Sequence, residues 1–368
     1  FLREVDGFQA LDARTQDEIC QAVVDDVRGR TPFMSEDAPD PAANLVAGTI
    51  SKAFGFTGPF VALNSACASS LHAILVGARA LQLGRIDMAV VGGASDCKSD
   101  SLVLFSNARA MSKTGTRPFD EDADGLVIAE GYVAIVMKTL ERAIADGDPI
   151  QAVVRGTGIS SDGKGKSLWA PRKEGQIKAM ERAYRGGVEM SSLQYLEAHA
   201  TATQLGDATE LNTLSEVLQD KVEPGRKIPV TSLKANIGHA LETAGAAGLV
   251  KTVLAIQNAT IPPAINIKKL NPKIDWDNVP LYVPTAATPW PAPSDGKPRC
   301  AGVNAFGIGG LNMHVVIEEF NESSKRLVPQ PPKSARGLTT AQDEAIAIVG
   351  MGCVLPGALD VQSYWDLL

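Results

Sequence analysis

The sequence predicts an α/β fold, in which short apolar strands alternate with amphipathic helices. Continuous apolar runs such as 132–137 have the composition of buried strands. Segments between such runs repeat apolar residues at helical spacing, as Leu71, Ile74, Leu75 and Ala78 do. Strand-like and helical segments also follow one another in turn along the chain, which favours parallel pairing of the strands.

The first part of the chain is expected to contain few elements. Its apolar run 60–63 predicts a short buried strand just before the helix that carries Leu71. The other elements predicted here are a helix over 17–27, strands over 88–91 and 132–137, and a short helix over 141–145.

The second part repeats this layout, because two of its strands lead to loops that carry a histidine and are followed by a helix. The stretch 302–314 holds four glycines and is expected to be a loop before a strand over 315–318. The remaining predicted elements are strands over 150–154, 193–198 and 228–233 and helices over 174–184, 207–218 and 242–257. The buried face predicted for the last helix consists of Leu249, Val250, Val253, Leu254 and Ile256.

The composition is that of a globular protein. The 368 residues, 45% hydrophobic and 21% charged, are enough to bury a substantial core. The 35 basic and 42 acidic residues give a formal net charge of -7, so we expect neither nucleic acid nor a membrane surface as a partner. Charge or glycine interrupts every long apolar stretch, so we expect no leader and no membrane span.

Five cysteines are scattered along the chain without the spacing of metal ligands. A chain of this size does not need disulfides to fold, so we expect reduced thiols, no bound metal and a cytoplasmic protein. The five are Cys20, Cys67, Cys97, Cys300 and Cys353.

Cys67 lies on a turn of small residues between the predicted strand 60–63 and the following helix. Unpaired N–H groups and the dipole at a helix N-terminus favour a thiolate, which is the reactive form of cysteine. A free cysteine can also be a small buried hydrophobic residue. This stretch alone leaves both interpretations open.

The acidic loop that follows Arg117 has part of the pattern of a calcium site. Asp120, Asp122 and Asp124 alternate as calcium ligands do. An EF-hand also needs a bidentate glutamate at the twelfth loop position, where this chain has Gly131. We therefore do not expect calcium here.

Two of the four histidines, His199 and His239, lie on small-residue loops that follow predicted strands. Small neighbours let a substrate approach an imidazole closely. The other two, His72 and His314, are expected to have structural roles.

Five motifs in this order resemble the β-ketoacyl synthases, and most closely the ketosynthase domains of type I polyketide and polyunsaturated fatty acid synthases. They extend over 58–319. The motifs are Ala66-Cys67-Ala-Ser-Ser-Leu71, Arg117-Pro-Phe-Asp120 with Asp124-Gly125, Glu197-Ala-His-Ala-Thr-Ala-Thr203 with Leu205-Gly-Asp207, Lys234-Ala-Asn-Ile-Gly-His239, and Gly307-Ile-Gly-Gly-Leu-Asn312 with His314.

The resemblance implies the thiolase-like α/β/α/β/α layered fold with two similar halves. It also implies a decarboxylative condensation, in which Cys67 takes an acyl chain and malonyl-acyl carrier protein extends it by two carbons. His199 and His239 would bind the malonyl thioester carbonyl, and the backbone N–H groups of Cys67 and Ile308 would hold the oxyanion.

The remaining roles also come from the resemblance. Lys234 and Glu210 match the family's supporting lysine and carboxylate, and Thr201 and Thr203 match hydroxyls that contact the pantetheine arm. The domain would bind no cofactor of its own, because phosphopantetheine arrives on the acyl carrier protein. A homodimer is the expected assembly.

Five positions depart from the family pattern, among them Asn64-Ser65, which stand where Asp-Thr is more common before the active cysteine. Ala200 and Ala202 stand where glycine is common, and Ile308 stands where phenylalanine often closes the acyl pocket. None of these changes removes a catalytic atom, but together they leave the preferred chain length open.

Three other functional classes compete with a condensing enzyme. A chain-length-factor-like subunit lacks the active cysteine, and a Cys-His hydrolase has no use for a second histidine loop or for Lys234. A malonyl decarboxylase or a transacylase would use the same residues without condensation.

The ends of the chain are out of the family's order. The segment 343–368 resembles the opening strand of a ketosynthase, yet it follows the polar, proline-containing stretch 320–342. We therefore predict a ketosynthase domain over 1–319 with an incomplete or rearranged N-terminal part, a linker over 320–342, and a separate ketosynthase-like segment.

Overall fold

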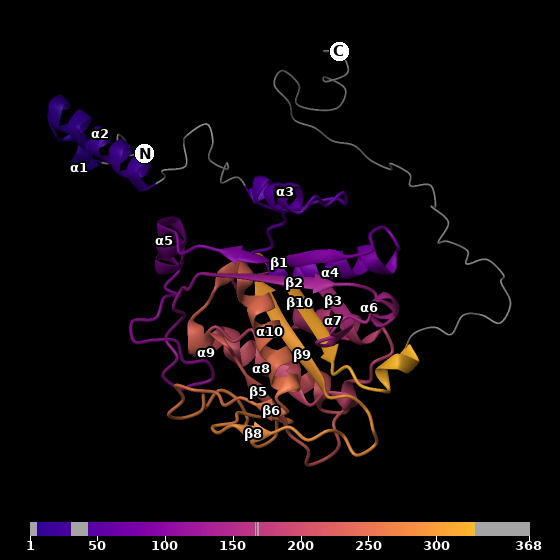
Figure 1. Cartoon of the computed structure of the whole chain (residues 1–368). Helices are drawn as coiled ribbons and strands as arrows, with labels where there is room; N and C mark the ends of the chain where they lie inside the picture. The colour runs from indigo at the N-terminus through magenta and orange to yellow at the C-terminus, as the bar shows by residue number, and fades with distance from the viewer. Residues whose placement is uncertain (1–5, 31–42, 166, 168, 328–368) are drawn as a thin grey trace, which may run out of the picture. The chain divides into compact units, whose positions relative to one another are not determined.

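The computed structural model describes residues 6–30, 43–165, 167 and 169–327 (Figure 1). Most of the predicted linker 320–342, the segment 343–368 and Cys353 therefore lie outside the described residues. No helix within the described ranges is both long enough and apolar enough to cross a bilayer.

The chain begins with three helices, α1 (Asp6–Gln9), α2 (Ala13–Arg30) and α3 (Ala43–Ala53). Helix α2 confirms the predicted helix over 17–27 and extends it at both ends.

A six-stranded sheet forms the centre of the fold (Figure 1). The strands that lead to the histidine loops, β4 and β5, pair in parallel, and β9 and β7 flank them in parallel. Strands β10 and β3 extend the other side of the sheet by antiparallel pairing. In sheet order the strands are β3 (Val153–Ser161), β10 (Leu311–Glu318), β9 (Cys300–Gly307), β4 (Tyr195–Glu197), β5 (Ile228–Thr231) and β7 (Leu281–Tyr282).

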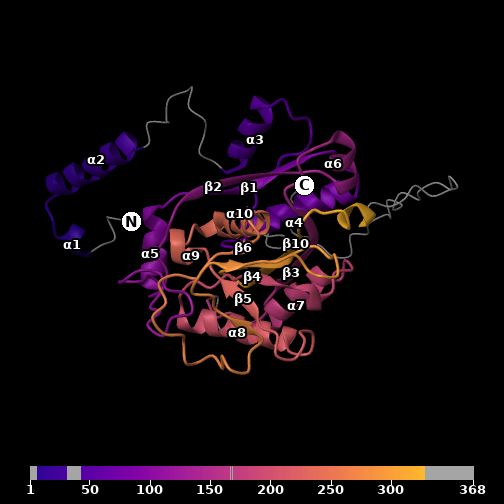
Figure 2. The ribbon, with the colours of Figure 1, turned by 60° about the horizontal axis from the view of Figure 1, so that its bottom comes forward.

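Helices cover both faces of this sheet (Figure 2). On one face α7 (Lys173–Tyr184) and α8 (Gln204–Leu218) bury Met180, Leu211 and Leu214 against β4 and β5. On the other face α4 (Ser69–Gln82) and α10 (Ala244–Gln257) pack against β9 and β10 through Leu71 and Leu249. Strand residues alternate between the two cores, as the period of two requires.

A second, two-stranded sheet lies beyond α4. Strands β1 (Ala89–Ser95) and β2 (Gly131–Met137) pair antiparallel, as the predicted strands near 88–91 and 132–137 anticipated. Gly77 lets α4 approach this sheet closely, since a Cβ there would lie 2.7 Å from Val91 Cγ1. On the opposite face Tyr132 is 70% exposed and Val136 is 64% exposed.

The layers therefore follow the predicted order of helices, sheet, helices and sheet, which confirms the α/β prediction. The fifth predicted layer would cover the face of β1 and β2 that carries Tyr132 and Val136. Within the described residues that face is open to solvent.

Three predictions of local structure were wrong. The run 60–63 is not a strand, and Phe60 and Val61 are more than half exposed, because no described strand pairs with this segment. The stretch 302–314 is not one loop, because β9 and β10 form a hairpin that turns at Gly309 and Gly310. On α10, Val250 and Leu254 face solvent rather than the core.

The buried face of α10 includes the predicted Leu249 and Ile256, but small residues make up most of it. A Cβ at Gly245 would lie 2.6 Å from Leu71 Cγ, so only glycine permits this approach of α10 to α4. Gly248 and Thr252 continue the same face. Apolar periodicity therefore predicted Leu249 and Ile256 correctly but not the small residues beside them, because close packing here selects small side chains.

Short elements complete the described fold. The predicted helix over 141–145 is present as α6, where the Thr139 side chain caps the N-terminus and Gly147 ends the helix with a φ of 70°. The others are α5 (Ser99–Asn107), α6 (Leu140–Asp146), α9 (Lys234–Ile237), β6 (Thr260–Ile261), β8 (Thr288–Pro289), and the 3-10 turns Met190–Ser192, Leu241–Thr243 and Ser324–Leu327.

Candidate active site

Cys67 lies on a tight turn that enters α4. The preceding residue, Ala66, has a φ of 51°, in the left-handed region that non-glycine residues rarely adopt. The Asn64 side chain accepts the Ala66 N–H at 2.8 Å, and Ser69 Oγ donates to the Ala66 carbonyl at 2.6 Å. These bonds hold the strained turn, so the position of Cys67 is fixed by its neighbours.

The thiol of Cys67 is buried and uncharged in the free protein. Burial raises its pKa to about 11, although the Lys234 ammonium opposes this rise. The backbone N–H groups of Cys67 and Ile308 also interact with the sulfur and lower the pKa. Of the two effects that the sequence left open, desolvation outweighs the local dipole in the free protein.

The second of these amides comes from the turn between β9 and β10. Gly307 begins that turn, and a Cβ at this position would lie 2.3 Å from the Ser65 carbonyl oxygen. Only glycine allows the hairpin to approach the Cys67 turn so closely. Ile308, the next residue, packs beside Leu126, Ile128 and Leu241.

His199 and His239 approach each other from two neighbouring parallel strands. His199 lies just beyond the end of β4, and His239 follows β5 and α9. Their ring centroids are 5.6 Å apart at an angle of 80°. The backbone of His239 is held by its N–H donating to the Val127 carbonyl at 2.7 Å.

Both imidazoles are neutral near pH 7. Burial, reinforced by the Lys234 ammonium, lowers the pKa of His199 and of His239 well below the ordinary value. Nδ1 of each ring is buried and has no hydrogen-bond partner within the described residues. A buried N–H without an acceptor is costly, so the tautomer with the proton on Nε2 is favoured.

Glu210 on α8 fixes the backbone of the His199 loop. Its Oε1 accepts the His199 N–H and its Oε2 accepts the Ala200 N–H, each at 2.8 Å. Burial raises the pKa of Glu210, while these bonds and one from Asn304 favour the carboxylate.

Asn304 and His314 continue this support. Asn304 Nδ2 donates to Glu210 Oε1 at 2.8 Å, so its Oδ1 must accept from His314 Nδ1 at 2.6 Å. His314 therefore carries its proton on Nδ1, and burial lowers its pKa to about 3. The structural role expected for His314 is the orientation of Asn304.

Lys234 is the central charge of the cluster, buried with 6% of its surface exposed. Burial lowers its pKa, while the negative charges of Glu197, Glu210 and Asp207 oppose the shift. The lysine in turn lowers the pKa of Cys67 and of both histidines.

A cavity of about 330 Å³ is lined by several of these residues, but not by Lys234. Cys67, His199, His239 and Glu210 all line it. The hydroxyls of Thr201 and Thr203 also line it and lie 3.2 Å apart. Further lining comes from Phe105, Arg109, Trp169, Leu205, Phe306 and Ile308.

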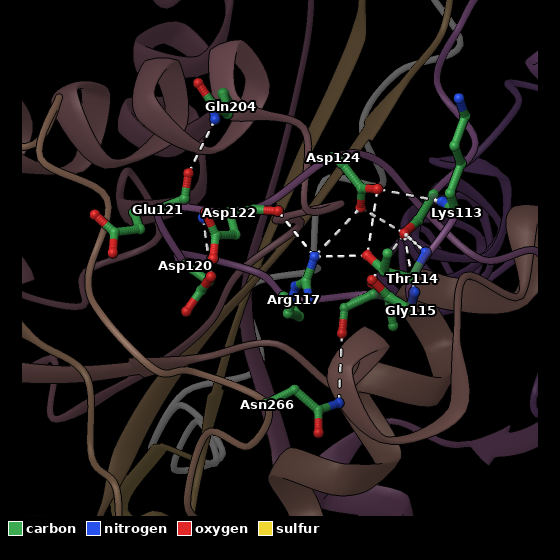
Figure 3. Close-up of polar contacts among 12 residues, drawn as sticks. Lys113, Thr114, Gly115, Arg117, Asp120, Glu121, Asp122, Asp124, Gln204 and Asn266 are labelled. Atoms are coloured by element: carbon green, nitrogen blue, oxygen red, sulfur yellow. Dashed lines mark hydrogen bonds and ion pairs between the residues drawn. The ribbon is translucent and has the colours of Figure 1, made fainter.

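Hydrogen bonds among its own residues hold the acidic loop after Arg117 (Figure 3). The Arg117 side chain donates to Thr114 Oγ1 at 2.6 Å and to the Asp122 carbonyl at 3.0 Å, with Asp124 3.7 Å away. Asp120 accepts the Asp122 N–H at 2.9 Å. Asp120 also accepts the backbone N–H groups of Lys268 and Lys269, so this carboxylate ties the loop to a distant segment as well.

This loop also braces the histidine loop. The Gly125 N–H donates to the Ala202 carbonyl at 2.9 Å, and the Phe119 N–H donates to Asp207 Oδ2 at 2.9 Å. Ala202 has a φ of 61°, so the alanine that departs from the family pattern sits where glycine is favoured.

Several members of the cluster were not singled out from the sequence. Asn304 lies in β9, a strand that was not predicted, and no local pattern marks its contact with Glu210. Phe306, whose ring centroid lies 5.5 Å from that of His199, was missed for the same reason. His72 is held by Ser65 Oγ, 3.0 Å from its Nδ1.

Three family descriptions match consecutive parts of the chain. The description "Beta-ketoacyl synthase, N-terminal domain" matches residues 8–143, and "Beta-ketoacyl synthase, C-terminal domain" matches residues 151–268. "Ketoacyl-synthetase C-terminal extension" matches residues 271–348.

The curated relatives are large polyketide synthases. A highly reducing polyketide synthase of Didymella fabae is 38% identical over 75% of this chain and 15% of its own length. The 6-methylsalicylic acid synthase of Penicillium expansum is 39% identical over 78% of this chain and 17% of its own length. The chain thus spans less than a fifth of either relative.

Solved ketosynthase structures share the fold. The ketosynthase from module 6 of the bacillaene synthase of Bacillus subtilis 168 is 37% identical with a TM-score of 0.74, over 76% of this chain and 51% of that one. The oxazolomycin ketosynthase domain of Streptomyces albus JA3453 is 35% identical with a TM-score of 0.75, over 81% of this chain and 52% of that one.

Proposed function

The chain belongs to the β-ketoacyl synthase family, and on that premise we propose that it condenses an acyl chain with a malonyl unit in polyketide or fatty acid synthesis. The observation that carries the proposal is the shared cavity, which Cys67, His199 and His239 line together. A thiol nucleophile beside two neutral imidazole donors suits acyl transfer followed by decarboxylation.

In the first half-reaction, Cys67 Sγ attacks the carbonyl of an acyl thioester carried by an acyl carrier protein. The thiol proton must leave as the bond forms, and it is transferred to the departing carrier sulfur, so that the carrier leaves as a thiol and both imidazoles remain neutral. The N–H groups of Cys67 and Ile308 stabilise the oxyanion, and the carrier thiol departs.

In the second half-reaction, His199 and His239 donate from Nε2 to the carbonyl of malonyl-acyl carrier protein. Carbon dioxide leaves, and the hydrogen bonds stabilise the enolate. The enolate carbon attacks acyl-Cys67, and the Cys67 thiolate leaves to give a 3-ketoacyl thioester. Neutral imidazoles suit this role because their remaining N–H is a donor at neutral pH.

The domain needs no cofactor of its own in this mechanism. Phosphopantetheine enters on the carrier protein, and the Thr201 and Thr203 hydroxyls are suited to bind its amides. The described cysteines are all free, in keeping with a reducing cytoplasm. A homodimer is supported by the exposure of Phe60 and Val61 beside the Cys67 turn, and light scattering would test it.

The test is to incubate the 368-residue chain with acyl- and malonyl-carrier protein and to analyse the products by mass spectrometry. A synthase gives a 3-ketoacyl thioester, whereas a decarboxylase gives only the acetyl thioester and carbon dioxide. Cys67→Ala is expected to abolish both the acyl-enzyme and the condensation product, and Cys97→Ala to retain them. An acyl adduct that persists in Cys67→Ala contradicts the assignment.

A further inference from the structure

Glu197 is a buried carboxylate that the proposed mechanism does not use. It is the last residue of β4, two positions before His199, and only 2% of its surface is exposed. Oε1 accepts the backbone N–H of Leu233 at 2.6 Å. Oε2 accepts from the Tyr195 hydroxyl at 2.9 Å.

The cation that neutralises Glu197 comes from α10. Lys251 Nζ lies 2.8 Å from Glu197 Oε2 and donates to Thr231 Oγ1 at 2.7 Å. The Lys251 side chain is only 12% exposed. One ion pair therefore joins β4, β5 and α10 beneath the catalytic loops.

The helix is shaped to admit this pair. Gly248 lies one turn before Lys251, and a Cβ at this position would lie 3.0 Å from Glu197 Cγ. A larger residue would crowd the carboxylate. The absence of a side chain at Gly248 thus gives Glu197 the space it occupies against α10.

Glu197 acts on Lys234 through both the backbone and its charge. The N–H that it accepts belongs to Leu233, directly before Lys234. Several negatively charged groups oppose the lowering of the Lys234 pKa, and Glu197 has the largest effect among them. The other charged or titratable groups acting on Lys234 include Glu210 and Asp207 of α8 and Cys67.

We propose that Glu197 and Lys251 form a positioning pair that fixes the Leu233–Lys234 backbone and balances the charge behind Cys67. The proposal rests on the function assigned to this site and adds two residues that act through Lys234 rather than on substrate. The two charges of the pair offset each other, so removing both leaves the net charge behind Cys67 unchanged, whereas removing one does not.

Two single variants test the charge balance. Glu197→Gln leaves Lys251 as an extra cation, so iodoacetamide should alkylate Cys67 about three- to tenfold faster at pH 7.5. Lys251→Met leaves Glu197 as an extra anion, so alkylation should slow by a similar factor. The double variant Glu197→Gln/Lys251→Met should return to the wild-type rate.

The opposite directions separate this role from simple loosening of the fold, which would change both variants alike. Lys251→Arg should restore the wild-type rate if Lys251→Met folds poorly. The matched control is Glu216→Gln, which removes an exposed pair with Lys173 and should leave alkylation unchanged. Equal rates in all variants, or shifts of the same sign, overturn the proposal.

The readout does not depend on condensation. If wild-type protein forms no 3-ketoacyl product but the two variants shift alkylation in opposite directions, the proposed function fails while the positioning pair stands. If condensation occurs but the shifts do not, only the positioning pair fails.

Discussion

Glu210 holds the backbone of His199 by accepting its N–H at 2.8 Å, across 11 residues of chain. The second carboxylate oxygen accepts the N–H of Ala200 at the same distance. Glu210, which the resemblance implied as a supporting carboxylate, is thus bonded directly to the loop that carries His199.

Glu210→Gln should destabilise the protein by about 2 kcal/mol, because the amide has one acceptor oxygen for two backbone N–H groups and leaves a buried group unpaired. Urea unfolding followed by circular dichroism measures this loss. The control is Glu216→Gln on the same helix, whose partner Lys173 is exposed, and it should leave the unfolding midpoint unchanged. Equal effects of the two variants would contradict the anchoring role.

Asp207 and Asp120 should give opposite pH dependences of stability. Burial raises the pKa of Asp207 to about 7, so the folded state retains a proton that the unfolded state has lost. The stability that Asp207 contributes to the folded state is fully present below its ordinary pKa near 4 and is lost as the pH rises to about 7. In Asp207→Asn, stability should fall less between pH 4 and 7 than in the wild type.

Burial raises the pKa of Asp120 too, but hydrogen bonds from the backbone N–H groups of Lys268, Asp122 and Lys269 lower it by more. The pKa of Asp120 therefore lies below its ordinary value. Its contribution is therefore present above the ordinary pKa and is lost as pH falls through the lowered value. Asp120→Asn should accordingly lose stability mainly above pH 4. Urea midpoints from pH 3 to 8 compare the two variants, and parallel curves would contradict both assignments.

Ala202→Gly should stabilise the protein by about 0.5–1 kcal/mol. Its φ of 61° is costly for alanine and free for glycine, and this relief exceeds the added chain entropy of the unfolded state. Ala200→Gly is the matched control in the same loop. Ala200 does not have a positive φ, so that variant should destabilise the protein instead. Thermal melts of both variants show whether each one stabilises or destabilises the protein.

The alkylation rate of Cys67 should rise with pH up to about 11, because burial keeps the thiol protonated near neutrality. Lys234→Met should slow the reaction at any fixed pH by removing the charge that stabilises the thiolate. Peptide mapping after iodoacetamide treatment follows Cys67 and the exposed Cys97 in one sample. A rate for Cys67 that is already constant above pH 8 would contradict the raised pKa.

The sequence predicted the parts of the site that local pattern encodes. Cys67, His199 and His239 each follow a strand-like run on a turn of small residues, and the structure brings all three to one cavity. Parallel strands such as β4 and β5 present their ends at one edge of a sheet, so loops that follow them meet.

The features of the fold and the site that the sequence did not predict depend on contacts between distant segments. The buried face of α10 is set by the approach of Gly245 to Leu71, which a search for large apolar residues overlooks. The pKa of Cys67 depends on how completely the fold buries it, and this is not a local property. The run 60–63 has strand-like composition, but no described strand pairs with it.

Because Gly307 lies close to the Ser65 carbonyl, the β9–β10 turn is sensitive to movements of the turn that carries Cys67. No side chain separates the two turns, so a shift of the Cys67 turn on acylation must displace the amides that follow Gly307. Hydrogen–deuterium exchange of the peptide that contains Ile308 would then record loading of the enzyme without a labelled substrate. The same closeness couples a movement of the Cys67 turn to the backbone N–H of Ile308.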